Sequence, residues 1–132
     1  MKTQKYDAIV LSSGDEKAAQ AKYLELFKNA PLPDDEIMAN MGLFLSSKSL
    51  SRLLFFYEMY QKIVDTHGII VECGVRWGQT LSTLAALRGI FEPFNRHRKI
   101  VGFDTFDGFR GMSEEDGKLC KCVDGSFGVA PE

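Results

Sequence analysis

Residues 71–80 read VECGVRWGQT, and this stretch decides the fold. The apolar run Gly68–Val71 comes just before and predicts a buried strand, with Glu72 at its carboxyl end. Gly74 and Gly78 frame a tight loop, and a helical pattern begins directly after them. A strand, a glycine loop and a helix in this order are typical of a ligand-binding edge in an α/β sheet.

A second strand is predicted over Lys99–Phe103, and it also ends in a carboxylate, Asp104. A helix from Gln79, closed by Gly89, would connect the two strands and make them parallel. The carboxyl ends of parallel strands meet at one edge of a sheet, so Glu72 and Asp104 are expected to converge. Together they predict a nucleoside-binding pocket.

The charge of this pocket decides which nucleoside fits. A dinucleotide site uses G-x-G-x-x-G, whose amides approach a pyrophosphate, whereas here Glu72 precedes G-x-x-x-G. A carboxylate there would repel pyrophosphate but would suit an ammonium and a sulfonium. S-adenosylmethionine carries both, and Asp104 could accept hydrogen bonds from its two ribose hydroxyls. The residues therefore favour S-adenosylmethionine over NAD.

These motifs resemble those of class I S-adenosylmethionine-dependent methyltransferases. VECGVRWGQT followed by VGFDTFDGF is similar to the first two nucleotide-site motifs, in particular those of the macrocin O-methyltransferase (TylF-like) family of sugar O-methyltransferases. The resemblance covers roughly residues 41–111 and includes the segment Met41–Gly42 and the helix around Leu50–Leu53. It implies a Rossmann-like α/β fold, present only in its amino-terminal portion, and methylation of a sugar or other small-molecule hydroxyl.

The resemblance also implies roles for single residues. Glu72 would hold the methionine amino group, the glycine loop would pass under the methionine chain, and Asp104 would bind the ribose, with Phe103 and Thr105 flanking the adenosine. Arg76 either reaches the ligand's carboxylate or faces water. The expected cofactor-binding residues are Glu72, Gly74, Val75, Arg76, Gly78, Thr80, Asp104, Thr105 and Phe106.

The resemblance places the catalytic base, and the carboxylates of a possible divalent-metal site, in a part that would follow Glu132. Only two strands of an approximately seven-stranded sheet can be placed here, because each strand-plus-helix unit takes roughly 30 residues. We therefore expect no methyl transfer from this chain alone, and an apolar sheet face that leaves it weakly stable or self-associated. The alternatives are a non-catalytic nucleoside-binding module and, less favoured, an NAD-dependent oxidoreductase.

Composition excludes several other classes. The 132 residues carry a net charge of -2, and the basic run Arg96–Lys99 is interpreted as a solvated loop, so nucleic-acid binding is not predicted. There is no apolar stretch long enough for a membrane span and no signal peptide, which favours a cytoplasmic protein. Three cysteines and two histidines indicate neither a disulfide framework nor a zinc set. A small-molecule acceptor is expected, and a homo-oligomer remains open.

Two domains are predicted: a helical segment over residues 1–66 and the first βαβ part of the cofactor domain over 67–132. Ser13-x-x-Glu16 is typical of a capping box before a helix that Pro31 stops. Leucines and aromatic residues at three- and four-residue steps predict a second helix, from the serines at 46–49 to Gly68. The stretch Gly108–Gly128 is expected to be a mobile loop or lid.

Overall fold

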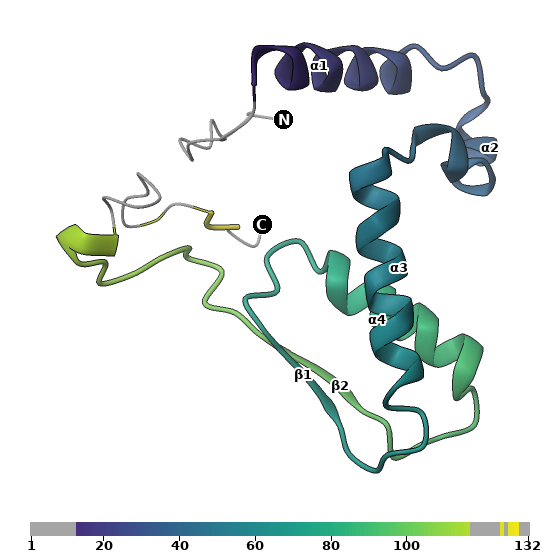
Figure 1. The fold of residues 1–132 in the computed structure, drawn as a ribbon, viewed down its shortest axis with the longest axis vertical. Coiled ribbons are helices and arrows are strands. Elements are labelled where there is room, and N and C mark those ends of the chain that lie inside the picture. Colours follow the sequence, from purple (N-terminus) through teal and green to yellow (C-terminus); the bar gives the residue numbers. More distant parts are fainter. Residues whose placement is uncertain (1–12, 117–124, 126, 130–132) are drawn as a thin grey trace. The chain divides into compact units, whose positions relative to one another are not determined.

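The computed structural model describes residues 13–116, 125 and 127–129 (Figure 1). These residues fall into two compact units that divide between Leu54 and Phe55. The domain division that the sequence predicts between residues 66 and 67 stays a prediction.

The first unit is helical and opens with the capping box. Helix α1 spans Gly14–Lys28, and the Oγ of Ser13 accepts from the Glu16 amide while the Glu16 carboxylate accepts from the Ser13 amide. This reciprocal pair satisfies two amides that a helix start otherwise leaves unpaired. Helix α2 follows over Asp34–Ala39, and a 3-10 turn, η1, covers Met41–Phe44.

Helix α3 spans Ser47–Gln61 and joins the two units. Its start is stabilised by Ser46, whose Oγ accepts from the Ser49 amide at 3.1 Å. The predicted end at Gly68 is wrong, because the helix stops at Gln61. The carbonyls of Ile63 and Thr66, which follow the helix, accept hydrogen bonds from the guanidinium of Arg98.

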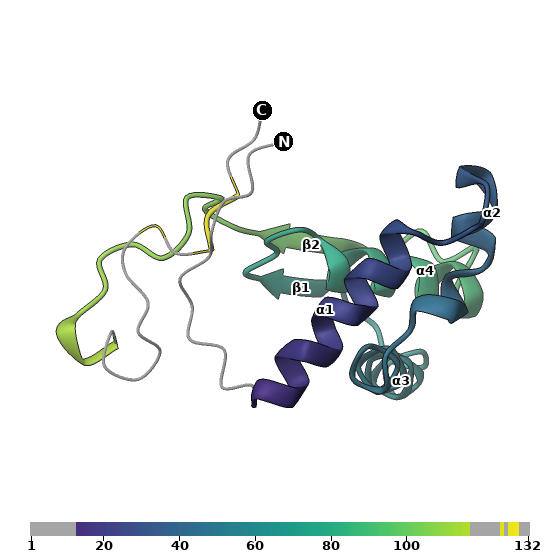
Figure 2. The ribbon, with the colours of Figure 1, turned by 90° about the horizontal axis from the view of Figure 1, so that it is seen from above.

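The second unit holds a two-stranded parallel sheet. Strands β1 (Ile70–Cys73) and β2 (Ile100–Phe103) pair in register, with Glu72 opposite Gly102, and helix α4 (Gln79–Phe91) connects them. Figure 2 shows the two strands side by side. This confirms the predicted strand, loop, helix and strand, and it places both strand ends at one edge.

Three predicted boundaries are corrected here. The first strand begins at Ile70 rather than Gly68 and runs through Glu72 to Cys73, so Glu72 lies within it. Gly89 does not close helix α4, which continues to Phe91 with Glu92 as its C-cap. A glycine ends a helix when it adopts a left-handed conformation, and Gly89 is not among the glycines with positive φ.

The hydrophobic core of this unit is small. Within the described residues, the buried apolar side chains are Tyr60 from α3 and Leu84 and Leu87 from α4. The ring of Tyr60 stacks on Phe91, with centroids 5.8 Å apart. Further apolar residues pack around these at partial burial, namely Phe56, Ile63, Val64, Ile70, Phe91 and Ile100. The core thus joins α3, α4 and one face of the sheet.

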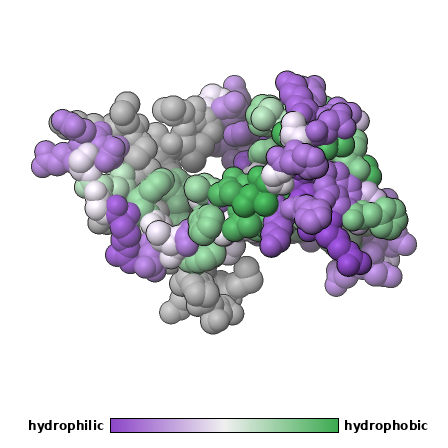
Figure 3. Space-filling view, turned by 90° about the horizontal axis from the view of Figure 1, so that it is seen from below, coloured by the Kyte–Doolittle hydropathy of each residue, from purple (hydrophilic) through white to green (hydrophobic). Residues whose placement is uncertain are grey.

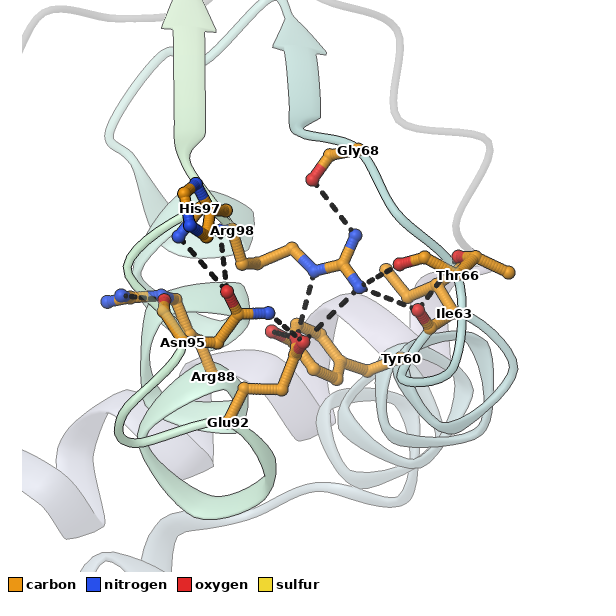
Figure 4. A network of polar contacts seen from close by, with 9 residues as sticks. All are labelled: Tyr60, Ile63, Thr66, Gly68, Arg88, Glu92, Asn95, His97 and Arg98. Carbon is orange, nitrogen blue, oxygen red and sulfur yellow. Dashed lines mark hydrogen bonds and ion pairs between the residues drawn. The ribbon is translucent and has the colours of Figure 1, made fainter.

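A buried ion pair sits beside this core (Figure 4). The Nε of Arg98 lies 2.9 Å from a carboxylate oxygen of Glu92, and the Tyr60 hydroxyl donates to the same oxygen at 2.6 Å. Hydrogen bonding from Arg98 lowers the pKa of Glu92 to about 2, against the opposing effect of burial. Burial and the bond to Glu92 raise the pKa of Tyr60 to about 12.

Arg98 also holds the loop before β1 in place through hydrogen bonds. Its remaining guanidinium nitrogens donate to the carbonyls of Ile63, Thr66 and Gly68, the first two from one nitrogen at 2.7 and 2.6 Å. A single side chain thus fixes the segment that leads from α3 into β1. The prediction that Arg96–Lys99 forms a solvated loop is wrong for Arg98, which is 4% exposed.

The opposite face of the sheet is open among the described residues. Val71 on β1 is 51% exposed and Phe103 on β2 is 60% exposed, which confirms the expected apolar face. Figure 3 shows one face of the molecule on which hydrophobic residues gather between hydrophilic ones. Each strand also has an edge without a partner strand in this part of the chain.

Candidate functional site

A cavity of about 820 Å³ lies where the two strands end. Residues from the loop after β1, from the end of β2 and from the segment that follows β2 surround it. The lining residues are Gly74, Arg76, Phe103, Asp104, Thr105, Gly108, Phe109, Arg110 and Phe127. This volume is in the range of about 300–1,000 Å³ that small-molecule sites occupy.

The glycine loop takes the shape that its sequence predicts. Gly74 and Gly78 have φ values of 86° and 77°, in the left-handed region that residues with a side chain rarely adopt. Gly78 is the N-cap of α4, and the Gly74 amide donates to the carbonyl of Phe103 on β2. The two glycines therefore turn the chain sharply from β1 into α4 beside the end of β2.

Asp104 binds the backbone of two loops. One carboxylate oxygen accepts from the Arg76 amide at 2.6 Å, and the other accepts from the Phe106 amide at 2.7 Å. These amides hold the pKa of Asp104 below its ordinary value, with the Arg76 amide the larger cause. Each carboxylate oxygen can accept more than one hydrogen bond, so these bonds are compatible with further donors from a ligand.

Glu72 lies on the same face of β1 as Ile70, toward the core, and it does not line the cavity. Its Oε2 is buried and has no hydrogen-bond partner among the described residues. A buried carboxylate oxygen without a donor is costly, so such an atom calls for a donor from elsewhere.

The predicted site residues separate into two sets. Gly74, Arg76, Asp104 and Thr105 line the cavity. The remaining predicted residues do not line it, namely Glu72, Val75, Gly78, Thr80 and Phe106. Val75, for example, packs beside Gly102, where an added Cβ would come within 2.6 Å of its side chain.

Four further residues of the cavity were missed: Gly108, Phe109, Arg110 and Phe127. The stretch Gly108–Gly128, expected to be a mobile loop or lid, is described only in part, since residues 117–124 and 126 lie outside the description. Phe127 nevertheless packs edge-to-face on Phe109, with ring centroids 5.7 Å apart. Only the aromatic residues in an otherwise polar stretch could have signalled this contact.

No group of three or more histidine, cysteine or acidic residues suited to a metal ion occurs in the described part of the chain. Cys73 is exposed and free, whereas Cys120 and Cys122 fall outside the description. No helix among the described residues is both long and apolar enough to cross a membrane. The cytoplasmic location and the oligomeric state stay predictions.

The comparisons with known proteins agree with this geometry. No protein-family model matches the chain, and no curated protein does. The solved structure of CalS11, described as a calicheamicin methyltransferase, matches at 36% identity and a TM-score of 0.81, over 98% of this chain and 51% of that one.

An apo structure of CalS11, described as a TDP-rhamnose 3'-O-methyltransferase of calicheamicin biosynthesis, matches at 40% identity and a TM-score of 0.71. This match covers 79% of the present chain and 44% of that one. The chain thus spans about half the length of the solved structures that it matches. By sequence identity and fold the chain is similar to about half of the methyltransferase CalS11, and its strand, glycine loop, helix and strand match part of a Rossmann-like methyltransferase fold.

Proposed function

We propose that the native protein is an S-adenosylmethionine-dependent O-methyltransferase of the TylF-like kind and that it methylates a hydroxyl of a sugar. The observation that carries this proposal is the pair of acidic residues near the carboxyl edge of the sheet, Glu72 within β1 and Asp104 directly after β2, beside the glycine loop. The likeness to CalS11, a TDP-rhamnose 3'-O-methyltransferase, supports a nucleotide-linked sugar as the acceptor.

The residues of this chain fit the cofactor. Glu72 has a buried carboxylate oxygen without a donor, and an ammonium would supply one. Asp104 keeps acceptor capacity beside the cavity for the hydroxyls of a ribose. The left-handed glycines keep side chains away from the loop over which a methionine chain would lie.

The cofactor supplies a methyl group on a positively charged sulfur. The contribution of the described residues is orientation, because the Asp104 carboxylate fixes the loop after β1 and the loop after β2 to each other. Two loops fixed in this way would hold the ends of one ligand at a constant separation, which lowers the entropic cost of reaching a reactive geometry. Aromatic side chains of Phe103, Phe109 and Phe127 give the cavity apolar walls.

The test is transfer of a labelled methyl group from S-adenosylmethionine by the native protein. The acceptor panel contains thymidine-diphosphate sugars, the corresponding free sugars and phenols. The proposal expects methylation of a sugar hydroxyl, with nucleotide-linked sugars preferred. Cofactor binding without methylation of any hydroxyl acceptor would favour the second candidate, a nucleoside-binding module without catalysis. The buried Glu72 oxygen without a hydrogen-bond donor is equally consistent with such a module.

A further inference from the structure

The segment around Phe127 is held against the loop that follows β2. The Gly125 amide donates to the Phe109 carbonyl, and the Val129 amide donates to the Phe106 carbonyl, both at 2.7 Å. At Gly128 an added Cβ would lie 3.0 Å from the carbonyl carbon of Asp107, so the two backbones approach closely. Phe127 therefore reaches the cavity from a fixed backbone position.

Backbone strain is concentrated at this place. Among the described residues, three that are not glycine have positive φ: Arg76 at 50°, Phe106 at 58° and Phe127 at 64°. Arg76 and Phe127 line the cavity, and Phe106 accepts the hydrogen bond that holds the Phe127 segment. Such conformations are unfavourable for residues with a side chain, and they persist mainly where a functional geometry requires them.

Arg76 is fixed at both ends. Its amide donates to Asp104, and the carbon at the centre of its guanidinium lies 5.0 Å from the centroid of the Phe127 ring. Stacking on a ring uses the face of a guanidinium, whereas its N–H groups point outward in the plane. The ring attracts the positive charge but takes up none of the guanidinium's planar fork, so a guanidinium held in this way can bind a planar anion such as a carboxylate.

We propose that Phe127 is a positioning residue that orients Arg76 to bind the carboxylate of the cofactor's methionine end. This inference rests on the proposed function, since it assumes that an S-adenosylmethionine-type ligand occupies the cavity. The amino-acid end of that ligand carries an ammonium and a carboxylate. Glu72 at the start of the glycine loop matches the first, and Arg76 within the loop matches the second.

The test compares two ligands by calorimetry on the full chain. S-adenosylhomocysteine has the amino-acid end, and 5'-methylthioadenosine has the same adenosine and sulfur without it. Arg76→Gln is expected to weaken S-adenosylhomocysteine about tenfold or more, because a bidentate charged pair is lost, and to leave 5'-methylthioadenosine within about twofold. Arg76→Lys keeps the charge without the planar fork and should fall between wild type and Arg76→Gln.

Phe127→Leu removes the ring but keeps an apolar side chain. It should reduce the ratio of the affinity for S-adenosylhomocysteine to the affinity for 5'-methylthioadenosine by about threefold or more. This loss is smaller than for Arg76→Gln, since the guanidinium stays but is less well oriented. Arg96→Gln is the control, because Arg96 is an exposed cation that does not line this cavity, and its loss should leave the affinities for both ligands unchanged.

An equal loss for both ligands in Arg76→Gln, or no loss for either, would overturn the role of Arg76. A selective loss in Arg76→Gln with an unchanged ratio in Phe127→Leu would overturn the positioning role of Phe127. If the wild-type chain binds neither ligand, the proposed function fails rather than this inference alone. Binding of both ligands by the wild type with no difference between them would again contradict a carboxylate contact.

Discussion

The backbone amide of Arg76 donates a 2.6 Å hydrogen bond to the Oδ2 of Asp104, so the end of β2 fixes the loop that follows β1. The two residues are 28 positions apart, and the parallel pairing of β1 with β2 brings them together. The same carboxylate orders the turn after β2 through the Phe106 amide. One acidic side chain thus organises both halves of the candidate site.

Asp104→Ala should weaken S-adenosylhomocysteine binding at least tenfold. The variant loses both loop contacts and the acceptor for the ribose hydroxyls, and hydrogen bonds to a charged group are stronger than those between neutral groups. Calorimetric titration measures the loss. Asp107→Ala is the control, because the Asp107 carboxylate is 66% exposed and its pairing with Arg110 is a surface contact. A loss below about threefold for Asp104→Ala would show that Asp104 is not a ligand contact.

Arg98→Met should destabilise the fold by about 3–5 kcal/mol, because it leaves the buried Glu92 carboxylate without its cation. The carbonyls of Ile63, Thr66 and Gly68 also lose their shared donor. Urea unfolding followed by circular dichroism measures the change. Arg96→Gln, on the exposed side of the same basic run, should shift stability by no more than about 0.5 kcal/mol. Similar midpoints for the two variants would contradict the account of the network.

The Glu92 pKa predicts how stability depends on pH. The folded value of about 2 lies below the ordinary value of 4.5, so the unfolded chain binds the proton first as the pH falls. This contribution is complete above about pH 4.5 and is lost as the pH falls toward 2. Urea midpoints measured from pH 6 to pH 2.5 should fall more steeply for wild type than for Glu92→Gln. Parallel curves would contradict the assignment.

Gly102 and Gly89 allow a matched comparison of two glycine-to-alanine substitutions. A Cβ at Gly102 would lie 2.6 Å from Val75 and 3.3 Å from Leu81, whereas a Cβ at Gly89 would meet nothing within 4 Å. Gly102→Ala should therefore cost about 1–3 kcal/mol by overpacking and weaken cofactor binding by shifting the glycine loop. Gly89→Ala, inside α4, should stabilise by about 0.5–1 kcal/mol. Equal effects in unfolding experiments would show that Val75 does not pack on β2.

Local sequence signals predicted the parts of the fold that depend on neighbouring residues. The capping box at Ser13 and the glycine loop before α4 each need only a few adjacent positions, and both are confirmed. The parallel pairing also followed, because a helix between two short apolar runs leaves little other choice.

Contacts between distant residues could not be predicted in this way. Arg98 lies in a basic run that looks solvated, and its burial depends on Glu92 and on carbonyls more than 30 positions earlier. The end of α3 at Gln61 depends on the same contacts, since its apolar pattern continues beyond that residue. Phe127 reaches the cavity through backbone hydrogen bonds to Phe106 and Phe109, which no periodicity encodes.

The central claim is that the site accepts an S-adenosylmethionine-type ligand because an acidic residue precedes the glycine loop. Its most direct test is a parallel calorimetric titration of the chain with S-adenosylhomocysteine, S-adenosylmethionine and NAD at one pH and salt concentration. Both adenosyl amino acids should bind, and NAD should bind at least about tenfold more weakly, since Glu72 disfavours a pyrophosphate there. Binding of NAD with equal or higher affinity would contradict this claim.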